Sequence, residues 1–214
     1  LWLRERRANT SNAVDSQSQP LGCLDTLYIN LDARTDRRAN LERNLEPFDF
    51  LATQRLSATK SQNPLVGHAE SHLRAMESIM ISGRPALVLE DDAKFEVEPA
   101  ELRRIIEAFL CDNRLDVLCL GYATGFAPIY LSHNFLVSFD LHTTVAYVAK
   151  PRAARQLASS FSQAAKMSAM GKPGRVAAGD SVWKRDQRRR LIFAIPKKRL
   201  VRQAPGWSDV QKAF

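Results

Sequence analysis

The stretch 86–92 reads ALVLEDD, a short apolar run that ends in three adjacent carboxylates, Glu90, Asp91 and Asp92. Turn-forming residues precede it, and its length is typical of a buried strand. A buried strand that ends in clustered negative charge is unfavourable unless a cation lies nearby. Because side chains alternate along a strand, we expect Glu90 and Asp92 on one side and Asp91 on the other.

The paired carboxylates Glu90 and Asp92 suit a hard cation such as Mn2+ or Mg2+, which often also binds substrate phosphates. They are therefore the candidate metal ligands. The alternative interpretation is a solvated acidic turn before the next helix, which would hold no ion.

Strand-like and helical segments alternate on both sides of this stretch. Strands are expected near 24–31, 51–58, 86–89, 116–121, 143–150, 191–196 and 198–203, and helices near 35–46, 66–81, 99–109, 151–161 and 180–187. The alternation predicts an α/β domain with a sheet that is largely parallel at its start. Ligands bind beyond the carboxyl ends of strands in such sheets, and Asn30 and the acidic triplet both lie at such ends.

The length of 214 residues is enough for one domain with a sizeable core. Residues 1–22 are polar and are interpreted as a flexible arm or processing remnant, which leaves 23–214 as the folded domain. No apolar run approaches the length of a membrane span. Three cysteines without metal-ligand spacing favour reduced thiols and a cytoplasmic setting.

Positive charge is concentrated in one segment, residues 184–202. This segment carries nine basic residues against one acid, a balance of +8 that equals the formal net charge of the whole chain. Such a segment attracts polyanions: a nucleotide pyrophosphate, a phosphorylated glycan, an anionic membrane face or nucleic acid. The alternative is a basic surface that is merely solvated.

The turn after the first strand reads YINLDARTDRR and is rich in arginine. Arginines at the N-terminus of a helix can bind the phosphates of a nucleotide. The candidates are Asn30, Arg34, Asp36, Arg37 and Arg38. The alternative is an ordinary helix with exposed arginines, capped by Thr35 or Asp36 and packed through Ala39, Leu41 and Leu45.

Two histidines, His68 and His72, lie four residues apart on one face of the 66–81 helix. A zinc-protease helix needs glutamate directly after the first histidine, and Ala69 occupies that place. No third ligand is evident from the sequence, so the protease interpretation is poor. Ser71 and His72 are instead expected at the edge of the site, or His72 is packed in the core.

Asp180 precedes the helical pattern 180–187. An aspartate at a helix start is most simply an N-cap, but a loop carboxylate near a metal site can also accept a proton from a hydroxyl. The two roles are compatible.

These segments together resemble glycosyltransferase family 25, which includes lipooligosaccharide and collagen galactosyltransferases. The resemblance spans residues 26 to about 210 and rests on the order YINLDARTDRR, GHAESHLRAM, ALVLEDD, TTVAYVAKPRAARQL, GDSVW and WSDV. It implies a GT-A-like fold, a UDP-sugar donor and a divalent metal, typically Mn2+. Residues 122–142 match no segment of the family, and RDQRRR, residues 185–190, is unusually basic.

The resemblance also assigns individual residues. Asn30, Leu31, Arg34, Asp36 and Arg37 match the nucleotide-side motif, Ser71 and His72 the Ser-His pair, Glu90, Asp91 and Asp92 the D-x-D metal motif, and Ser208 and Asp209 the closing Ser-Asp. Asp180 matches an acid that precedes the late helix. In an inverting displacement Asp180 is the first candidate for the catalytic base and Asp209 the second.

The expected function is therefore transfer of galactose or glucose to a glycan such as lipooligosaccharide, at the inner membrane face or in the cytoplasm. Two alternatives remain open. One is a transferase that glycosylates hydroxymethylated bases in nucleic acid, with residues 184–202 on the phosphates. The other is a non-catalytic module that binds anionic polymers, although such a module has no evident need for three adjacent carboxylates.

Overall fold

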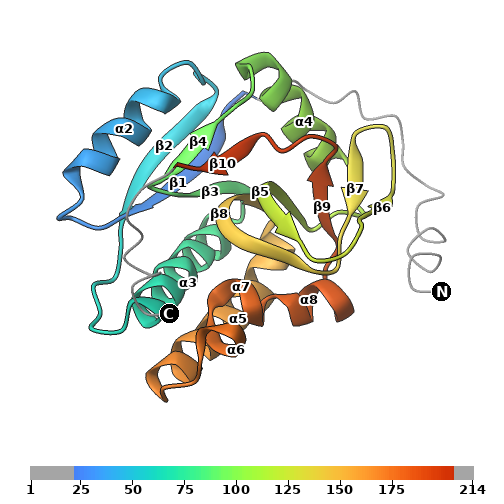
Figure 1. The fold of residues 1–214 in the computed structure, drawn as a ribbon. Coiled ribbons are helices and arrows are strands. Elements are labelled where there is room, and N and C mark those ends of the chain that lie inside the picture. The colour runs from blue at the N-terminus through green and yellow to red at the C-terminus, as the bar shows by residue number, and fades with distance from the viewer. Residues whose placement is uncertain (1–21, 205–214) are drawn as a thin grey trace.

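A mixed eight-stranded sheet forms the centre of the computed structural model, which describes residues 22–204 (Figure 1). Its strands are β1 (Leu24–Asn30), β2 (Leu51–Ser57), β3 (Ala86–Glu90), β5 (Val117–Thr124), β6 (Ile129–Tyr130), β7 (Phe135–Val137), β8 (Leu141–Ala149) and β9 (Phe193–Pro196). They lie in the order β2-β1-β3-β8-β5-β9-β7-β6, and β8 and β7 run against the others. The predicted α/β class, with a mostly parallel central sheet, is confirmed.

Helices cover both faces of this sheet. One face carries α2 (Thr35–Leu45) and α4 (Pro99–Cys111), and the other carries α3 (Pro64–Ser82) and α5 (Pro151–Ala169) (Figure 1). The buried residues accordingly form two large apolar clusters, because alternate side chains of each strand face opposite layers. Three short helices, α6 (Gly174–Ala177), α7 (Gly179–Val182) and α8 (Lys184–Arg189), adjoin α5. A separate antiparallel pair joins β4 (Ala93–Phe95) to β10 (Val201–Gln203).

The pairing of β1 with β3 places the candidate site. The two strands are parallel neighbours, and Ile29 pairs with Glu90 in their register. The carboxyl ends of both strands therefore meet at one edge of the sheet, as predicted for Asn30 and the acidic triplet. The strand itself ends at Glu90, and Asp91 and Asp92 form a turn. The alternation that predicted Glu90 and Asp92 on one side therefore does not continue through the triplet.

Several local predictions for α2 and α7 are wrong. Thr35 is the first residue of α2 rather than its cap, and Arg34 occupies the cap position without a side-chain hydrogen bond. Ala39 is exposed, because α2 contacts the sheet through a narrow face that buries Leu41 and Leu45. Asp180 lies inside α7, whose cap position is Ala178, so it is not an N-cap.

Some predicted features lie outside the part of the chain that the structure describes. Residues 1–21 of the predicted arm 1–22 and the closing Ser208 and Asp209 fall outside residues 22–204. Within residues 22–204, no helix combines the length and apolar character that a bilayer span requires.

Candidate functional site

A cavity of about 580 Å³ opens at the edge where β1 and β3 end. Its volume lies within the range typical of small-molecule sites. The predicted site residues that line it are Leu31, Arg37, Ser71, His72, Glu90, Asp91, Asp92 and Asp180. Residues from distant parts of the sequence are thus brought to one cavity.

Arg37 contacts two members of the acidic triplet. Its guanidinium lies 2.9 Å from Asp91 Oδ1 and 3.4 Å from Asp92 Oδ2. Asn30 donates from Nδ2 to Asp91 Oδ2 at 2.8 Å, and Gln203 donates from Nε2 to Asp92 Oδ2 at 2.9 Å. One arginine, from the first strand-to-helix turn, therefore offsets part of the negative charge of Asp91 and Asp92.

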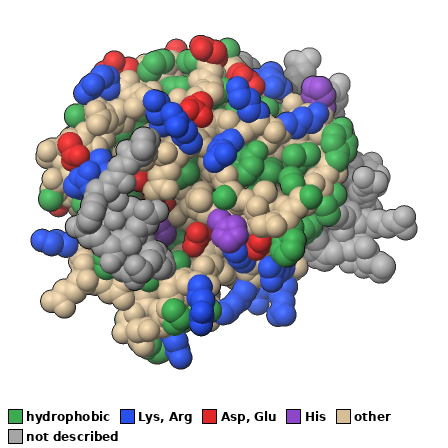
Figure 2. Space-filling view, in the orientation of Figure 1, with side chains coloured by type: hydrophobic (Ala, Val, Ile, Leu, Met, Phe, Trp, Pro, Cys, Tyr) green, Lys and Arg blue, Asp and Glu red, His purple; other side chains and the backbone are tan. Residues whose placement is uncertain are grey.

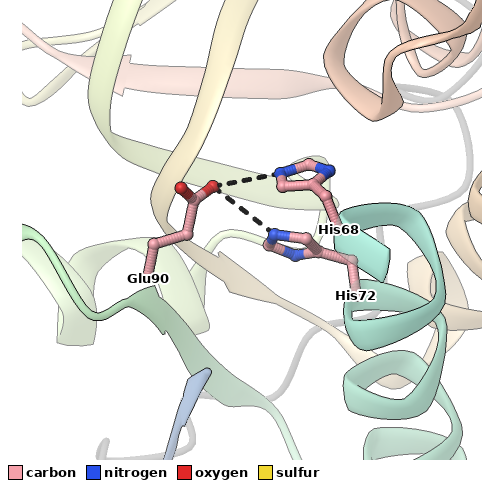
Figure 3. Close-up of side chains that lie close together, drawn as sticks. All are labelled: His68, His72 and Glu90. Atoms are coloured by element: carbon pink, nitrogen blue, oxygen red, sulfur yellow. Dashed lines mark hydrogen bonds and ion pairs between the residues drawn. The ribbon is translucent and has the colours of Figure 1, made fainter. Parts of the chain in front are cut away.

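Glu90 faces a different set of partners, and Figure 3 shows two of them, His68 and His72. Its Oε1 lies 3.4 Å from His68 Nε2 and 3.4 Å from His72 Nε2, and it accepts a hydrogen bond from Thr144 Oγ1 at 2.5 Å. The histidines come from successive turns of α3, whose start is fixed by Asn63, the N-cap that accepts from the amide of Leu65. Ligand atoms of His68, His72 and Glu90 all lie within 4.8 Å of one another, so this group could hold a metal ion.

Burial and charge set the protonation of this cluster. Burial and the charge of His68 lower the pKa of His72 to about 4, so His72 is neutral at neutral pH. Burial opposes the charged forms of His68 and Glu90, but their mutual attraction outweighs it: the pKa of His68 is raised and the pKa of Glu90 is well below its ordinary value. Burial and then the charge of Glu90 raise the pKa of Asp92 to about 6.

Two buried polar atoms at this edge have no hydrogen-bond partner among the described residues. They are His72 Nε2 and Asp92 Oδ1. The other ring nitrogen of His72, Nδ1, lies 2.9 Å from the Tyr147 hydroxyl, while the ring stacks on Phe161. Unsatisfied buried polar atoms are rare in folded proteins and call for an explanation, such as a bound ligand.

A strained residue in β8 supports this arrangement. Thr143 has a positive φ of 74°, which is unusual for a β-branched residue, at a point where the pairing of β8 with β5 shifts register. Its amide donates to Asp180 Oδ2 at 3.2 Å, and the next residue, Thr144, contacts Glu90. Strain of this kind is commonly retained at functional sites.

Replacing Thr143 with glycine should give a more stable protein than replacing it with alanine, by about 1 kcal/mol. Both variants lose the hydrogen bond from Thr143 Oγ1 to the carbonyl of Gly121, but glycine alone relieves the backbone strain. The free energy of unfolding from urea titration measures the difference. Equal stability of the two variants would show that the positive φ carries little strain.

The remaining nucleotide-side candidates lie next to the first cavity. Arg34 and Asp36 line an adjoining cavity of about 620 Å³, together with Arg37, Asp91 and Asp92. Arg34 forms a two-pronged ion pair with Asp36 and, through this hydrogen bonding, lowers the pKa of Asp36 to about 2. Residues of the predicted turn and two members of the acidic triplet therefore line the same cavity.

Ser71 forms two hydrogen bonds that the sequence did not indicate. Its hydroxyl donates to the carbonyl of Gly67 at 2.6 Å and accepts from the amide of Thr59 at 2.9 Å. A Cβ on Gly67 would lie 2.4 Å from the carbonyl oxygen of Thr59, so only glycine permits this approach. Ser71 thus fixes the loop at 58–61 against α3, and its predicted contact with a cofactor stays a prediction.

The basic segment 184–202 is partly engaged within the domain. Lys184 and Arg188 pair with Asp140, Arg202 pairs with Glu96, and Arg190 donates to Gln156. Figure 2 shows further Lys and Arg side chains gathered at the lower edge of the molecule, where Figure 1 places α6 and α8. Binding of a glycan or nucleic acid by this segment stays a prediction.

Sequence reasoning missed part of the cluster around Glu90. It set His68 aside for want of a third ligand, and the structure supplies Glu90 in that position. Thr144 and Gln203 were also missed. Thr144 lies in the segment TTVAYVAKPRAARQL but was given no role, Gln203 lies in no motif, and each reaches the triplet from a distant strand. Asp92 is not a member of the group of potential metal ligands around Glu90.

No protein-family model and no curated protein matches the chain. Several solved structures are similar to it at low sequence identity. One is a glycosyltransferase involved in the glycosylation of the major capsid of PBCV-1, with 13% identity, coverage of 89% of this chain and 97% of that chain, and a TM-score of 0.47. Another is mannose-1-phosphate geranyltransferase from Thermus thermophilus, with 11% identity, coverage of 88% of this chain and 76% of that chain, and a TM-score of 0.44. A third is mouse xyloside xylosyltransferase 1, with 12% identity, coverage of 81% of this chain and 71% of that chain, and a TM-score of 0.43.

Proposed function

We propose that this protein is a metal-dependent glycosyltransferase that moves a hexose, galactose or glucose, from a UDP-sugar to a hydroxyl of a glycan such as lipooligosaccharide. One observation carries the proposal. Members of four separate sequence motifs, at 30–37, 71–72, 90–92 and 180, converge on adjoining cavities at the carboxyl ends of β1 and β3. They belong to four of the six segments on which the resemblance to family 25 rests.

Arg37 and Arg34 would bind the donor diphosphate. Arginine suits this task because its planar guanidinium forms paired, charge-assisted hydrogen bonds with phosphate. Arg37 lines both cavities, so a nucleotide that spans them would pass this side chain. Asp91, held by Asn30 and Arg37, would accept hydrogen bonds from ribose hydroxyls.

The residues at this edge also fit the divalent metal that the resemblance implies. Unpartnered, buried Asp92 Oδ1 and His72 Nε2 are both potential ligand atoms beside an ionised Glu90. Glu90 would hold the ion, together with Asp92 or with the imidazoles that face Glu90. When bound, such an ion would stabilise negative charge on the departing diphosphate.

Asp180 would act as the base toward the acceptor. Its carboxylate lines the cavity and is held by the amide of Thr143. In the proposed inverting displacement the acceptor oxygen forms a bond to the anomeric carbon as the bond from that carbon to the diphosphate oxygen breaks. The acceptor proton passes to the Asp180 carboxylate, and the bonding electrons leave with UDP.

The proposal predicts Mn2+-dependent release of UDP from at least one sugar in a panel of UDP-sugars. We expect Asp92→Ala to lower this rate by about 100-fold or more, since it removes a carboxylate at the donor edge. Asp49→Ala is a matched control, because Asp49 is an exposed carboxylate that does not line either cavity. Failure of wild-type protein to bind or turn over any nucleotide sugar with a metal would overturn the proposal.

A further inference from the structure

The members of the acidic triplet face two kinds of partner. Asp91 and Asp92 are paired with the guanidinium of Arg37, whereas Glu90 faces two imidazoles. A cation is therefore already present beside Asp91 and Asp92. Asp92 Oδ1 and His72 Nε2 are both buried and make no hydrogen bond among the described residues, but only His72 Nε2 lies on the side without an arginine, facing Glu90 and next to His68.

We propose that His68, His72 and Glu90 form a binding site for a transition-metal ion of the Zn2+ class, rather than for a hard ion held by carboxylates alone. The idea that this ion is the cofactor of a transferase rests on the proposed function. Binding of the ion can be measured without turnover. The site would use Nε2 of each histidine and a carboxylate oxygen of Glu90.

Two of the three ligand-atom distances match such an ion, and all three ligand atoms lie within 4.8 Å of one another. Zn2+ binds imidazole nitrogen and carboxylate oxygen at about 2.0–2.1 Å, so two ligand atoms of a tetrahedral site lie about 3.3–3.4 Å apart. Glu90 Oε1 lies 3.4 Å from both His68 Nε2 and His72 Nε2. Two histidines four residues apart on one helix, completed by a carboxylate from another element, form a common three-ligand arrangement that leaves one position open.

The surrounding residues fix these ligands in place. The Tyr147 hydroxyl contacts Nδ1 of His72, and a proton on Nδ1 leaves the lone pair on Nε2. The hydroxyl of Thr144 donates to Glu90 and lies 3.0 Å from His68 Nε2, so ion binding would replace the latter contact. Metal-binding residues are characteristically oriented by outer hydrogen bonds of this kind.

The ligand chemistry predicts the selectivity of the site. Imidazole nitrogens favour Zn2+, Co2+, Ni2+ or Cu2+, whereas Mg2+ prefers oxygen ligands and retains its water. We therefore expect Zn2+ and Co2+ to bind at concentrations at which Mg2+ does not.

Titration of the untagged, chelator-treated full chain with Zn2+ tests the inference, with Co2+ as a spectroscopic probe. We expect one ion per chain, visible Co2+ absorption of a four-coordinate site, and no displacement by an equal concentration of Mg2+. Glu90→Gln and His72→Asn should each weaken binding by about 100-fold or more, and Tyr147→Phe by about 10-fold. Circular dichroism establishes that each variant is folded, and Glu90→Gln, which keeps the size of the side chain, serves if His72→Asn unfolds.

The other two histidines of the chain supply matched controls. His133→Ala and His142→Ala remove imidazoles that do not belong to the cluster, and both should bind Zn2+ as the wild type does. No binding by the wild type, or unchanged binding by folded Glu90→Gln, overturns the inference. Zn2+ binding without turnover of any nucleotide sugar would refute the proposed function alone, and Mn2+-dependent turnover without Zn2+ or Co2+ binding would refute this inference alone.

Discussion

Replacing Asp180 with asparagine should lower kcat for sugar transfer by about 10²- to 10⁴-fold while leaving the KM for the donor nearly unchanged. Asparagine cannot accept the acceptor proton, but its carbonyl oxygen can still accept the hydrogen bond from the amide of Thr143, which lies 3.2 Å from Asp180 Oδ2. The fold of β8 should therefore be preserved. Steady-state kinetics with the best UDP-sugar and acceptor measure the change.

Asp209→Asn provides the comparison that separates the two predicted bases. If Asp180 is the base, Asp209→Asn should retain most of kcat. If Asp180→Asn retains kcat within about threefold and Asp209→Asn loses it, the base is Asp209 and the role of Asp180 is positional. A large rise in donor KM for Asp180→Asn would instead indicate that its charge acts on the donor.

The residues at the carboxyl edge of the sheet were predictable, because the ends of β1 and β3 are marked by local sequence patterns. A short apolar run bounded by turn residues, such as 86–89, favours a buried strand, and polar residues directly after it emerge at the carboxyl end. Asn30 and the triplet were therefore expected to meet, and their hydrogen bond at 2.8 Å confirms this. The amphipathic pattern of α3 likewise predicted a helix, which places His68 and His72 on the same side.

The partners of each carboxylate were not predictable, because they depend on packing between distant elements. Thr144 reaches Glu90 since β8 inserts, antiparallel, between β3 and β5, and nothing in the local pattern of β8 gives its direction. The division of the triplet follows from the end of β3 at Glu90, which releases Asp91 and Asp92 into a turn toward Arg37. The sequence shows three adjacent acids, and their different environments arise only in the folded chain.

Replacing Arg37 with methionine should weaken UDP binding by about 10- to 100-fold, the loss expected for one or two hydrogen bonds to a charged phosphate. The same change leaves Asp91 and Asp92 without the guanidinium that lies 2.9 and 3.4 Å from them, and Asp92 is largely buried. The free energy of unfolding should therefore fall by about 3 kcal/mol. Calorimetric titration with UDP and urea unfolding measure the two effects.

Arg38→Met is the matched control for this prediction. Arg38 follows directly on the same helix, but its exposed side chain pairs with Glu42 four residues away and does not line either cavity. We expect this variant to bind UDP as the wild type does and to lose less than about 0.5 kcal/mol of stability. Arg37→Lys should give an intermediate affinity, because lysine keeps the charge but not the planar fork. If Arg37→Met loses stability yet binds UDP as tightly as Arg38→Met does, Arg37 serves only to neutralise Asp91 and Asp92, and the donor phosphates are bound elsewhere.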